Sequence, residues 1–341
     1  MEQVTTIGLD IAKHVSQVHG ADAAGHALFR RRLTRTRLIG FLAAQRPCVV
    51  AMEACASAHY WAREISKLGH HVRLIPPAYV KPFIKRQKSD VADAEAICEA
   101  AQRPSMRFVP VKSEEQQANG LVFRARDLLV RQRTQCINAL RGHLLEYGHV
   151  FPQGVNHVAT LVALVEEPQS SLPEGVRTVL KLLVETFTAL EGQIAELDAE
   201  INHRSKTDLT ARRLMTIPGV GPIIATAVTA LVPVPENFSA GRGFAAWLGL
   251  TPLQKSTGGK QKLGAVSKRG ERTIRRLLII GASAVVQQAS RRGASKGSWL
   301  ARMLARKPKM LVIMALANKI ARIIWALLVK GGVYTAPVVA A

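Results

Sequence analysis

The stretch Ile7-Gly-Leu-Asp10 is an apolar run that closes on an acid, and the same arrangement returns at Cys48-Val-Val-Ala-Met-Glu53. Both runs have the length and composition of buried β-strands. A carboxylate at the end of a buried strand is costly unless a charge or a hydrogen bond offsets its desolvation. Two such strand ends therefore indicate a common site for Asp10 and Glu53.

The residues around these two runs predict a mixed α/β sheet with helices packed on it. Strands are expected at Val4–Leu9, His14–His19, Ala27–Leu33, Cys48–Met52 and His71–Ile75, and helices at Thr36–Gln45 and Ala58–Leu68. Strands followed by alternating helices and strands are typical of a mixed sheet covered by helices. In this arrangement Asp10 and Glu53 lie at the ends of neighbouring inner strands.

A second pair of acids occurs in Lys88-Ser-Asp90-Val-Ala-Asp93-Ala94. The pattern from Asp90 to Ala101 is helical, with Ser89 as its N-cap. Residues three apart share a helix face, so both carboxylates could point at the strand ends. Oxygen ligands of this kind suit Mg²⁺ or Mn²⁺, which bind phosphate oxygens and activate a nucleophile for phosphoryl transfer.

The chain is strongly basic, with 47 Lys and Arg against 24 Asp and Glu in 341 residues and a formal net charge of +23. Between Ala240 and Met310 there are 16 Lys or Arg and a single acid, Glu271. A solvated surface normally mixes the two signs. Such a positive field favours a polyanion as partner, and nucleic acid is the first expectation.

Other features argue against secretion, zinc and a membrane. The four cysteines and ten histidines show no CxxC, HxxxH or paired Cys/His spacing, so buried thiols in a reducing cytoplasm are expected. The N-terminus lacks the pattern of a signal peptide. The apolar segment from Met310 to Lys330 contains Asn318, Lys319 and Arg322. These polar residues favour an amphipathic or buried helix over a membrane span.

Two long helices are predicted in the middle of the chain, from Ser113 to about Tyr147 and from about Glu174 to Ser205, with a loop-rich stretch at 148–173 between them. In the second helix, apolar residues recur at alternating steps of three and four: Leu180, Leu183, Phe187, Leu190, Ile194, Leu197 and Ile201. This heptad seam can pack within the chain as an antiparallel hairpin or join two subunits. The pattern leaves both possibilities open.

The C-terminal third contains a Pro-Gly-Val-Gly turn at 218–221 and a Ser-Thr-Gly-Gly segment at 256–259. The turn predicts a helix-hairpin-helix motif in which glycine amides approach a phosphate, or else a plain turn between helices. The second segment predicts a mobile, electropositive loop whose field lowers the cost of an alkoxide, although an ordinary turn has the same composition. The residues expected to contact nucleic acid are Gly219, Gly221, Lys255, Lys260, Lys262, Lys268, Arg269, Arg275 and Arg276.

Taken together and in this order, these frames resemble the DEDD-type insertion-sequence transposases, relatives of the Piv invertase. The matching pieces are Ile7–Lys13, Met52–Ala54, Lys88–Ala94, Ile217–Gly221, Leu248–Pro252, Ser256–Gly258 and Ser267–Leu277. The resemblance implies an RNase H-like (RuvC-like) α/β domain over 1–110, a helical coiled-coil region over 111–205, and a mainly α-helical transposase domain over 206–341.

The resemblance also implies that Asp10, Glu53, Asp90 and Asp93 form a metal-binding tetrad and that a serine joins covalently to a DNA end. Ser256 is preferred because a primary hydroxyl is less hindered, and Thr257 is the alternative. One branch of the family has four residues between the preceding proline and the serine, whereas this chain has three. Ser256 and the tetrad lie in different predicted domains, so the active site could be assembled between subunits.

The partners that the resemblance implies are DNA and a non-coding guide RNA. A homodimer or homotetramer in the bacterial cytoplasm, associated with the nucleoid, is expected, because recombination joins two duplexes. Two other functions remain open at this point. A metal-dependent nuclease or junction resolvase would use the tetrad to activate water, and a non-catalytic nucleic-acid-binding protein would use the basic surface alone.

Overall fold

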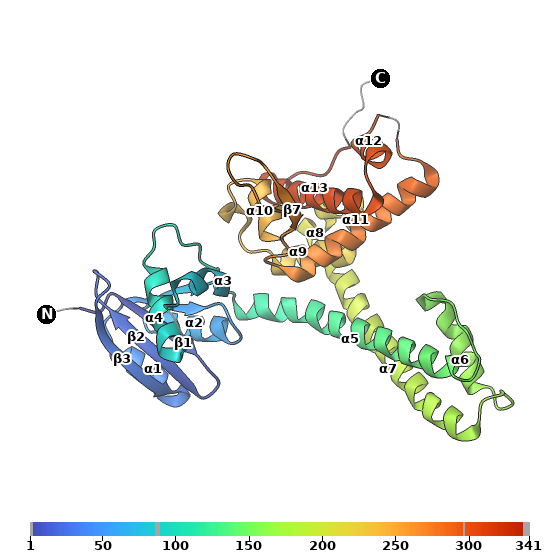
Figure 1. Cartoon of the computed structure of the whole chain (residues 1–341), viewed down its shortest axis with the longest axis horizontal. Helices are drawn as coiled ribbons and strands as arrows, with labels where there is room; N and C mark the ends of the chain where they lie inside the picture. The colour runs from blue at the N-terminus through green and yellow to red at the C-terminus, as the bar shows by residue number, and fades with distance from the viewer. Residues whose placement is uncertain (1–2, 86–88, 296, 337–341) are drawn as a thin grey trace. The chain divides into compact units, whose positions relative to one another are not determined.

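The computed structural model describes residues 3–85, 89–295 and 297–336. The chain divides into two compact units, unit 1 (Met1–Gln117) and unit 2 (Ala118–Ala341), shown from blue to red in Figure 1. Unit 1 contains a five-stranded sheet, and unit 2 consists mainly of helices.

The sheet of unit 1 has the strand order β3-β2-β1-β4-β5. Its strands are β1 (Thr6–Ile11), β2 (Val15–Ala21), β3 (Ala27–Thr34), β4 (Val49–Glu53) and β5 (His71–Ile75). The first three pair antiparallel, and β4 and β5 run parallel to β1. The predicted mixed α/β sheet is confirmed. One boundary differs: Asp10 lies within β1 and not beyond its end, because the ladder with β2 continues to Ile11.

Helices cover both faces of this sheet. On one face, α1 (Arg35–Ala43) and α2 (Ala58–Lys67) enclose a core that includes Ile7, Leu9 and Trp61. On the other face lie α3 (Pro77–Val80), the 3₁₀ turn η1 (Lys81–Phe83) and α4 (Asp90–Ala101). Along β4, for example, Val50 and Met52 belong to the first core and Ala51 to the second, as the two-residue period of a strand requires. Figure 1 shows α4 lying over β1 and β2.

Helices α5 (Glu114–Leu145) and α7 (Glu174–Thr207) form an antiparallel hairpin. Apart from the start of α5, this hairpin belongs to unit 2. Arg126 forms a bidentate pair with Asp198 at 2.5 and 2.9 Å, and Arg133 contacts Glu191 at 2.6 Å. The second pair lies further along α5 and correspondingly earlier along α7, as expected when two helices run in opposite directions. Within this chain, therefore, the apolar seam of α7 packs in a hairpin.

The middle of the stretch 148–173 is helical, so the expectation of a loop-rich connection was wrong there. This stretch contains the 3₁₀ turn η2 (Val155–His157) and helix α6 (Val158–Glu166). The buried residues Val158, Leu161 and Val165 step three and four apart, which is a helical stripe. The latter two pack with Leu140 and Leu180 into a small core at the end of the hairpin.

The remainder of unit 2 surrounds one large apolar core. Its elements are α8 (Leu209–Leu214), α9 (Pro222–Leu231), η3 (Pro235–Asn237), α10 (Gly241–Trp247), β6 (Pro252–Gln254), β7 (Leu263–Val266), α11 (Arg272–Arg292), α12 (Trp299–Arg306) and α13 (Lys309–Lys330). The core includes Ile224, Phe244, Leu278 and Ile320. Helices α9, α10, α11 and α13 contribute these four side chains, so the predicted mainly α-helical region has a packed core of its own.

Helix α13 is the one helix in the described ranges that is long and apolar enough to cross a membrane. In this structure its residues Val312, Ile320 and Ile324 are buried in the core of unit 2. The side-chain amide of Asn318 donates a hydrogen bond to the Leu250 carbonyl at 3.1 Å. These contacts are those of a buried core helix, as the interrupting polar residues predicted.

Candidate active site and nucleic-acid surface

The parallel pairing of β1 and β4 brings two of the predicted acids together. Gly8 pairs with Ala51 and Leu9 with Met52, so Asp10 and Glu53 follow as the next pair in this register. Neighbouring strands lie about 4.8 Å apart, and residues in register share a face. Both carboxylates are half-buried. They occupy the carboxyl ends of two adjacent inner strands, as the sequence predicted.

The crossing of α4 over β1 determines where the other two acids lie. The Cys98 thiol lies 3.7 Å from the Thr6 carbonyl, and a Cβ placed on Gly8 would be 2.2 Å from the Ala94 carbonyl. Only glycine permits this approach. Cys98 lies at Thr6 and Ala94 lies at Gly8, so the helix runs antiparallel to the strand. One turn of a helix is about as long as two residues of a strand. The next turn brings Asp90 to the level of Asp10.

Asp93 contains an unsatisfied polar atom. Its Oδ1 is buried and has no hydrogen-bond partner in the described structure. The Ser89 hydroxyl accepts a hydrogen bond from the Ala92 amide at 3.2 Å, which confirms the predicted N-cap of α4. A buried carboxylate oxygen without a partner is destabilising by about 1–3 kcal/mol or more. A cation would satisfy it.

In residues 3–85, 89–295 and 297–336, no group of three or more His, Cys, Asp or Glu side chains is arranged to hold a metal ion. The structure therefore brings Asp10 and Glu53 into register and places the start of α4 at the same end of the sheet, but it does not show a closed set of four ligands. The chemistry of the donors, oxygen only, fits a hard divalent cation.

The Cys55 thiol reports the negative potential at this edge. Burial raises its pKa, and the charges of Glu53 and Asp10 raise that pKa further. Among the other thiols, burial raises the pKa of Cys48 and of Cys98 to about 11 each. Cys55 is exposed, unlike the buried Cys98 and Cys136. The sequence did not single out Cys55 as a neighbour of the acids.

Ser256 lies in the connection between the paired strands β6 and β7, two residues beyond the end of β6. Strands β6 and β7 pair antiparallel, and Thr257 and Lys260 exchange backbone hydrogen bonds at the turn. The Ser256 hydroxyl donates to Gln254 Oε1 at 3.0 Å and accepts from the Lys262 amide at 3.1 Å. Its orientation is therefore set by two bonds. Gln254, the last residue of β6, is a neighbour of the hydroxyl that the sequence did not single out.

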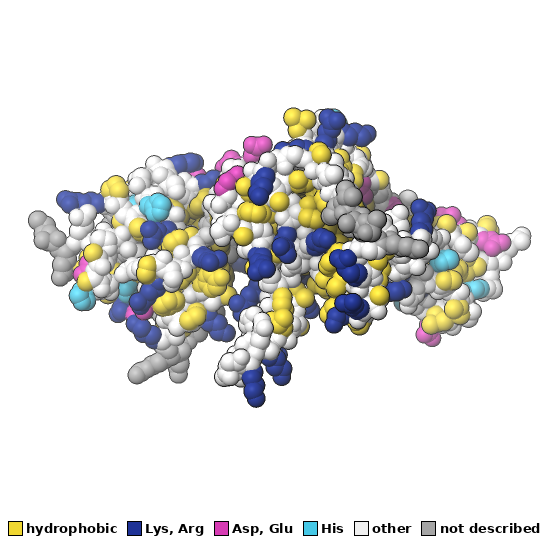
Figure 2. All heavy atoms as spheres, turned by 90° about the horizontal axis from the view of Figure 1, so that it is seen from above, with side chains coloured by type: hydrophobic (Ala, Val, Ile, Leu, Met, Phe, Trp, Pro, Cys, Tyr) yellow, Lys and Arg dark blue, Asp and Glu magenta, His cyan; other side chains and the backbone are white. Residues whose placement is uncertain are grey.

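The surroundings of this hydroxyl are positively charged. Lys255, Lys260 and Lys262 are exposed on the hairpin, together with Ser256 and Thr257. On the face of the molecule seen in Figure 2, Lys and Arg side chains are visibly more frequent than acids. This agrees with the net charge of +23. A phosphodiester would be attracted to such a surface.

Two of the four cations predicted near the start of α11 have partners within the protein. Arg275 is buried, and its Nη1 donates to the carbonyls of Leu248 at 2.9 Å and Arg269 at 2.8 Å. The expectation that Arg275 contacts nucleic acid is not supported, because its guanidinium holds the 248–269 region together. Arg276 forms an ion pair with Asp127 of α5, which the sequence analysis also missed. Lys268 and Arg269 remain exposed.

The Pro-Gly-Val-Gly turn joins α8 to α9, and the two glycines have different roles. Gly219 has φ +86°, and a Cβ there would lie 2.8 Å from the Gly281 carbonyl of α11. Gly219 is therefore a position where α11 packs closely against the turn, and the phosphate contact expected of its backbone amide stays a prediction. Gly221 is the N-cap of α9, and a Cβ there would meet nothing within 4 Å.

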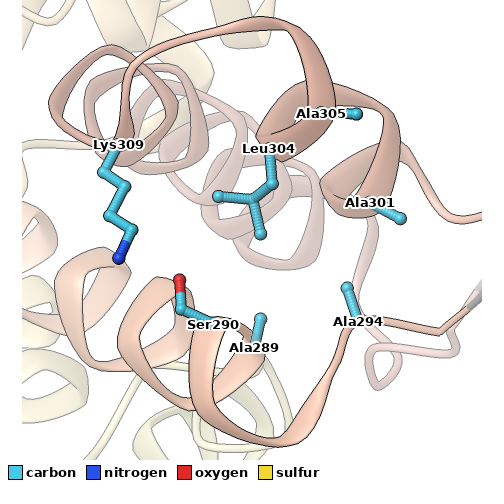
Figure 3. Close-up of a pocket in the computed structure, with 7 residues that line it drawn as sticks. All are labelled: Ala289, Ser290, Ala294, Ala301, Leu304, Ala305 and Lys309. Carbon is cyan, nitrogen blue, oxygen red and sulfur yellow. The ribbon is translucent and has the colours of Figure 1, made fainter.

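A shallow cavity of about 470 Å³ lies between α11, α12 and the start of α13 (Figure 3). Its lining consists of Ala289, Ser290, Ala294, Ala301, Leu304, Ala305 and Lys309. None of the predicted site residues is among them. Most of these side chains are small and apolar, so the cavity does not contribute to the site described above.

Comparisons with known proteins agree with this architecture. A family model described as "Transposase IS116/IS110/IS902 family" matches residues 211–296, and a DEDD-type IS110 model described as "Transposase" matches residues 7–149. The chain is 47% identical to a "Probable family 20 transposase" of Pseudomonas aeruginosa over 97% of this chain and 98% of that protein. The sheet with its strand-end acids and these matches together define an insertion-sequence transposase.

Two further relatives are transposases of named elements. The identity is 42% to the transposase of IS1328 from Yersinia enterocolitica, over 98% of this chain and 100% of that protein. It is 36% to the transposase of IS1111A from Coxiella burnetii, over 98% of this chain and 92% of that protein. The chain belongs to the IS116/IS110/IS902 family of transposases. The family resemblance seen in the sequence is confirmed.

Proposed function

We propose that this transposase exchanges DNA strands in a divalent-metal-dependent reaction in which Ser256 becomes covalently joined to a DNA end. The observation that carries the proposal is the register of β1 and β4, which aligns Asp10 with Glu53 while α4 brings its acidic first turn to the same end of the sheet. Carboxylates gathered at one end of a sheet can hold divalent cations, which stabilise the attacking and leaving oxygens of a phosphoryl transfer.

The residues assigned to metal binding are Asp10, Glu53, Asp90 and Asp93. The unsatisfied Oδ1 of Asp93 supports this assignment, as does the purely oxygen donor set. Bound Mg²⁺ or Mn²⁺ would supply Lewis-acid stabilisation of the phosphate oxygens. The protein's own contribution is a rigid frame, because the two strands are inner strands of the sheet and α4 is in backbone contact with β1.

Ser256 is assigned the covalent step. Its Oγ attacks the scissile phosphorus, the phosphodiester bond to the leaving oxygen breaks, and that oxygen takes up a proton while the hydroxyl proton passes to solvent. Gln254 orients the hydroxyl, and the lysines of the hairpin stabilise the developing alkoxide. The number of phosphodiester bonds is unchanged, so rejoining requires no external energy source.

The first test compares Asp10→Asn, Ser256→Ala and Thr257→Ala in the full chain, with DNA carrying the ends of the element. We expect Ser256→Ala to bind DNA but to form no covalent adduct on a denaturing gel, and Thr257→Ala to form it. An adduct that survives Ser256→Ala and disappears with Thr257→Ala would move the nucleophile to Thr257. Free 5′-phosphate and 3′-hydroxyl products without an adduct would support a hydrolytic nuclease.

For the acids, we expect Asp10→Asn to abolish strand cleavage in Mg²⁺ while DNA binding in EDTA is retained. Asp22→Asn is the matched control, since Asp22 lies in the β2–β3 turn and bonds to His26 at 2.8 Å. If Asp10→Asn cleaves as well as Asp22→Asn does, the proposed metal site is wrong.

Two partners complete the proposal. A non-coding RNA as sequence guide is supported by the resemblance to the family and by a basic surface suited to reading backbone and helix shape. A homodimer or homotetramer is supported by the geometry of recombination between two duplexes. Sequencing RNA that co-purifies with the protein tests the first, and light scattering of the purified chain tests the second. No enriched RNA, or a monomer at all concentrations, would contradict them.

A further inference from the structure

The sheet of unit 1 carries a polar row that extends from the acids to the edge strand. Asp10 of β1 is in register with Gln17 of β2, and Gln17 is in register with Arg32 of β3. With Glu53 on β4, the row crosses four adjacent strands. Residues directly opposite one another on paired strands share a face of the sheet. The register therefore aligns two acids, an amide and a cation.

The face to which Arg32 belongs is fixed by its neighbours two residues away. Arg30 donates to Glu95 Oε2 of α4 at 3.1 Å and to His19 Nδ1 at 3.5 Å. Gly8, two residues before Asp10, faces the Ala94 carbonyl of the same helix. Since side chains alternate along a strand, Asp10 and Arg32 both belong to the α4 side of the sheet.

The two arginines on this face differ in what they contact. Arg30 forms a salt bridge with Glu95. Arg32 is exposed, and within the described ranges it has no salt bridge and no side-chain hydrogen bond. Two strand spacings place its backbone about 10 Å from that of Asp10. A guanidinium at this position is free for an external anion, close to acids that would otherwise repel one.

We propose that Arg32, together with Gln17, binds the backbone phosphate next to the phosphate undergoing reaction, so that a nucleic-acid strand crosses β1, β2 and β3. The guanidinium fork matches a phosphate bidentately, and the amide of Gln17 adds a neutral donor between the cation and the acids. This inference rests on the proposed function of the acids and adds to it the direction in which the substrate strand leaves them.

The same edge strand supplies a matched control. Arg31 is also exposed on β3, but it belongs to the opposite face with Phe29 and Leu33, which pack against the α1 side core. Arg31→Gln and Arg32→Gln remove the same charge from adjacent positions of one edge strand. The two variants change the net charge and the edge strand in the same way, but they act on opposite faces of the sheet. A difference in DNA binding between them therefore reports a contact on the face of Arg32.

The measurement is the affinity of the full chain for a fluorescently labelled duplex in EDTA, titrated over a range of salt concentrations. We expect Arg32→Gln to raise Kd by roughly tenfold and to reduce the slope of log K against log salt by about 1, the loss of one phosphate contact. Arg31→Gln should leave the slope unchanged. Arg32→Lys should keep the slope, because the charge is retained.

A second variant covers the case in which Arg32→Gln does not fold. Gln17→Glu adds a negative charge to the row and should weaken DNA binding. The control is Gln45→Glu in the α1–β4 connection, which adds the same charge at the other end of β4 and should leave DNA binding unchanged. Equal slopes for the two arginine variants, or equal affinities for the two glutamine variants, would overturn the inference.

These outcomes are separable from those of the proposed function. Asp10→Asn in EDTA should not weaken binding, since it removes a negative charge from the row. If Asp10→Asn cleaves DNA normally while Arg32→Gln alone loses a phosphate contact, the metal site is wrong and the phosphate contact stands. If Asp10→Asn is inactive and the two arginine variants bind alike, the metal site stands and the phosphate contact is wrong.

Discussion

Gly8 of β1 and Ala94 of α4 are in backbone contact: a Cβ at Gly8 would lie 2.2 Å from the Ala94 carbonyl oxygen and 2.6 Å from the Cys98 amide nitrogen. Neither neighbour is a flexible side chain that could move away. This contact sets the height of α4 above the sheet. Because Asp90 and Asp93 begin that helix, the contact also sets the position of two of the four acids.

Gly8→Ala should therefore separate α4 from β1. We expect a loss of about 1–3 kcal/mol of stability from overpacking, and a larger loss of transposition activity because the acidic turn is displaced. Chemical unfolding and an activity assay check this. Gly40→Ala at an exposed position of α1, where a Cβ meets nothing within 4 Å, is the control and should be neutral or stabilising by up to about 1 kcal/mol. Equal stabilities of the two variants would contradict the prediction.

A corresponding contact exists in unit 2, where a Cβ on Gly281 of α11 would lie 2.1 Å from the Gly219 carbonyl. Gly281→Ala should push α11 away from the α8–α9 turn and destabilise the protein by about 1–3 kcal/mol. Urea unfolding followed by circular dichroism measures the change. Gly192→Ala on α7, where a Cβ meets nothing within 4 Å, provides the baseline. The interpretation of Gly219 as a packing residue is wrong if Gly281→Ala is as stable as that control.

Arg275 and Arg269 should respond differently to mutation. Arg275→Ala leaves the carbonyls of Leu248 and Arg269 without their donor, which should cost about 1–3 kcal/mol of stability. Arg269→Ala keeps its own carbonyl as an acceptor and removes an exposed cation, so it should weaken DNA binding with little change in stability. Thermal unfolding and DNA titration of both variants test this. Reversed effects would assign Arg275 to the DNA surface after all.

The Cys55 thiol gives a pH-dependent readout of the acidic edge. Its pKa is raised by burial and then by the charges of Glu53 and Asp10, so at a fixed pH near neutrality little thiolate is present. Asp10→Asn removes one of these charges, lowers the pKa and should speed alkylation of Cys55 by iodoacetamide. The pH–rate profile of the variant should move to lower pH.

Cys98 is the internal reference for that experiment, since burial raises its pKa to about 11 and its side chain is 2% exposed. It should remain unmodified in the folded protein. Mass spectrometry of the two cysteine-containing peptides distinguishes the sites. An unchanged rate at Cys55 in Asp10→Asn would mean that Asp10 does not act on this edge of the sheet.

Much of unit 1 could be predicted from the sequence because its information is local. The strand at 71–75 and the helix at 90–101 have the predicted bounds, and the Ser89 cap is present. Apolar runs, turn residues and caps determine such elements from neighbours a few positions away. For the same reason the acids at the strand ends were recognisable. The resemblance of the chain to its family was visible from these short motifs and their order along the sequence.

The tertiary structure alone decided which groups face one another. Gly219 packs against the backbone of Gly281, which is distant along the chain. The guanidinium of Arg275 is buried against the carbonyls of Leu248 and Arg269. The distinction between Arg31 and Arg32 likewise depends on strand register, which pairing partners fix. Sequence determines the kinds of residue and their local periodicity, whereas burial and pairing between distant segments determine which charges remain available for DNA.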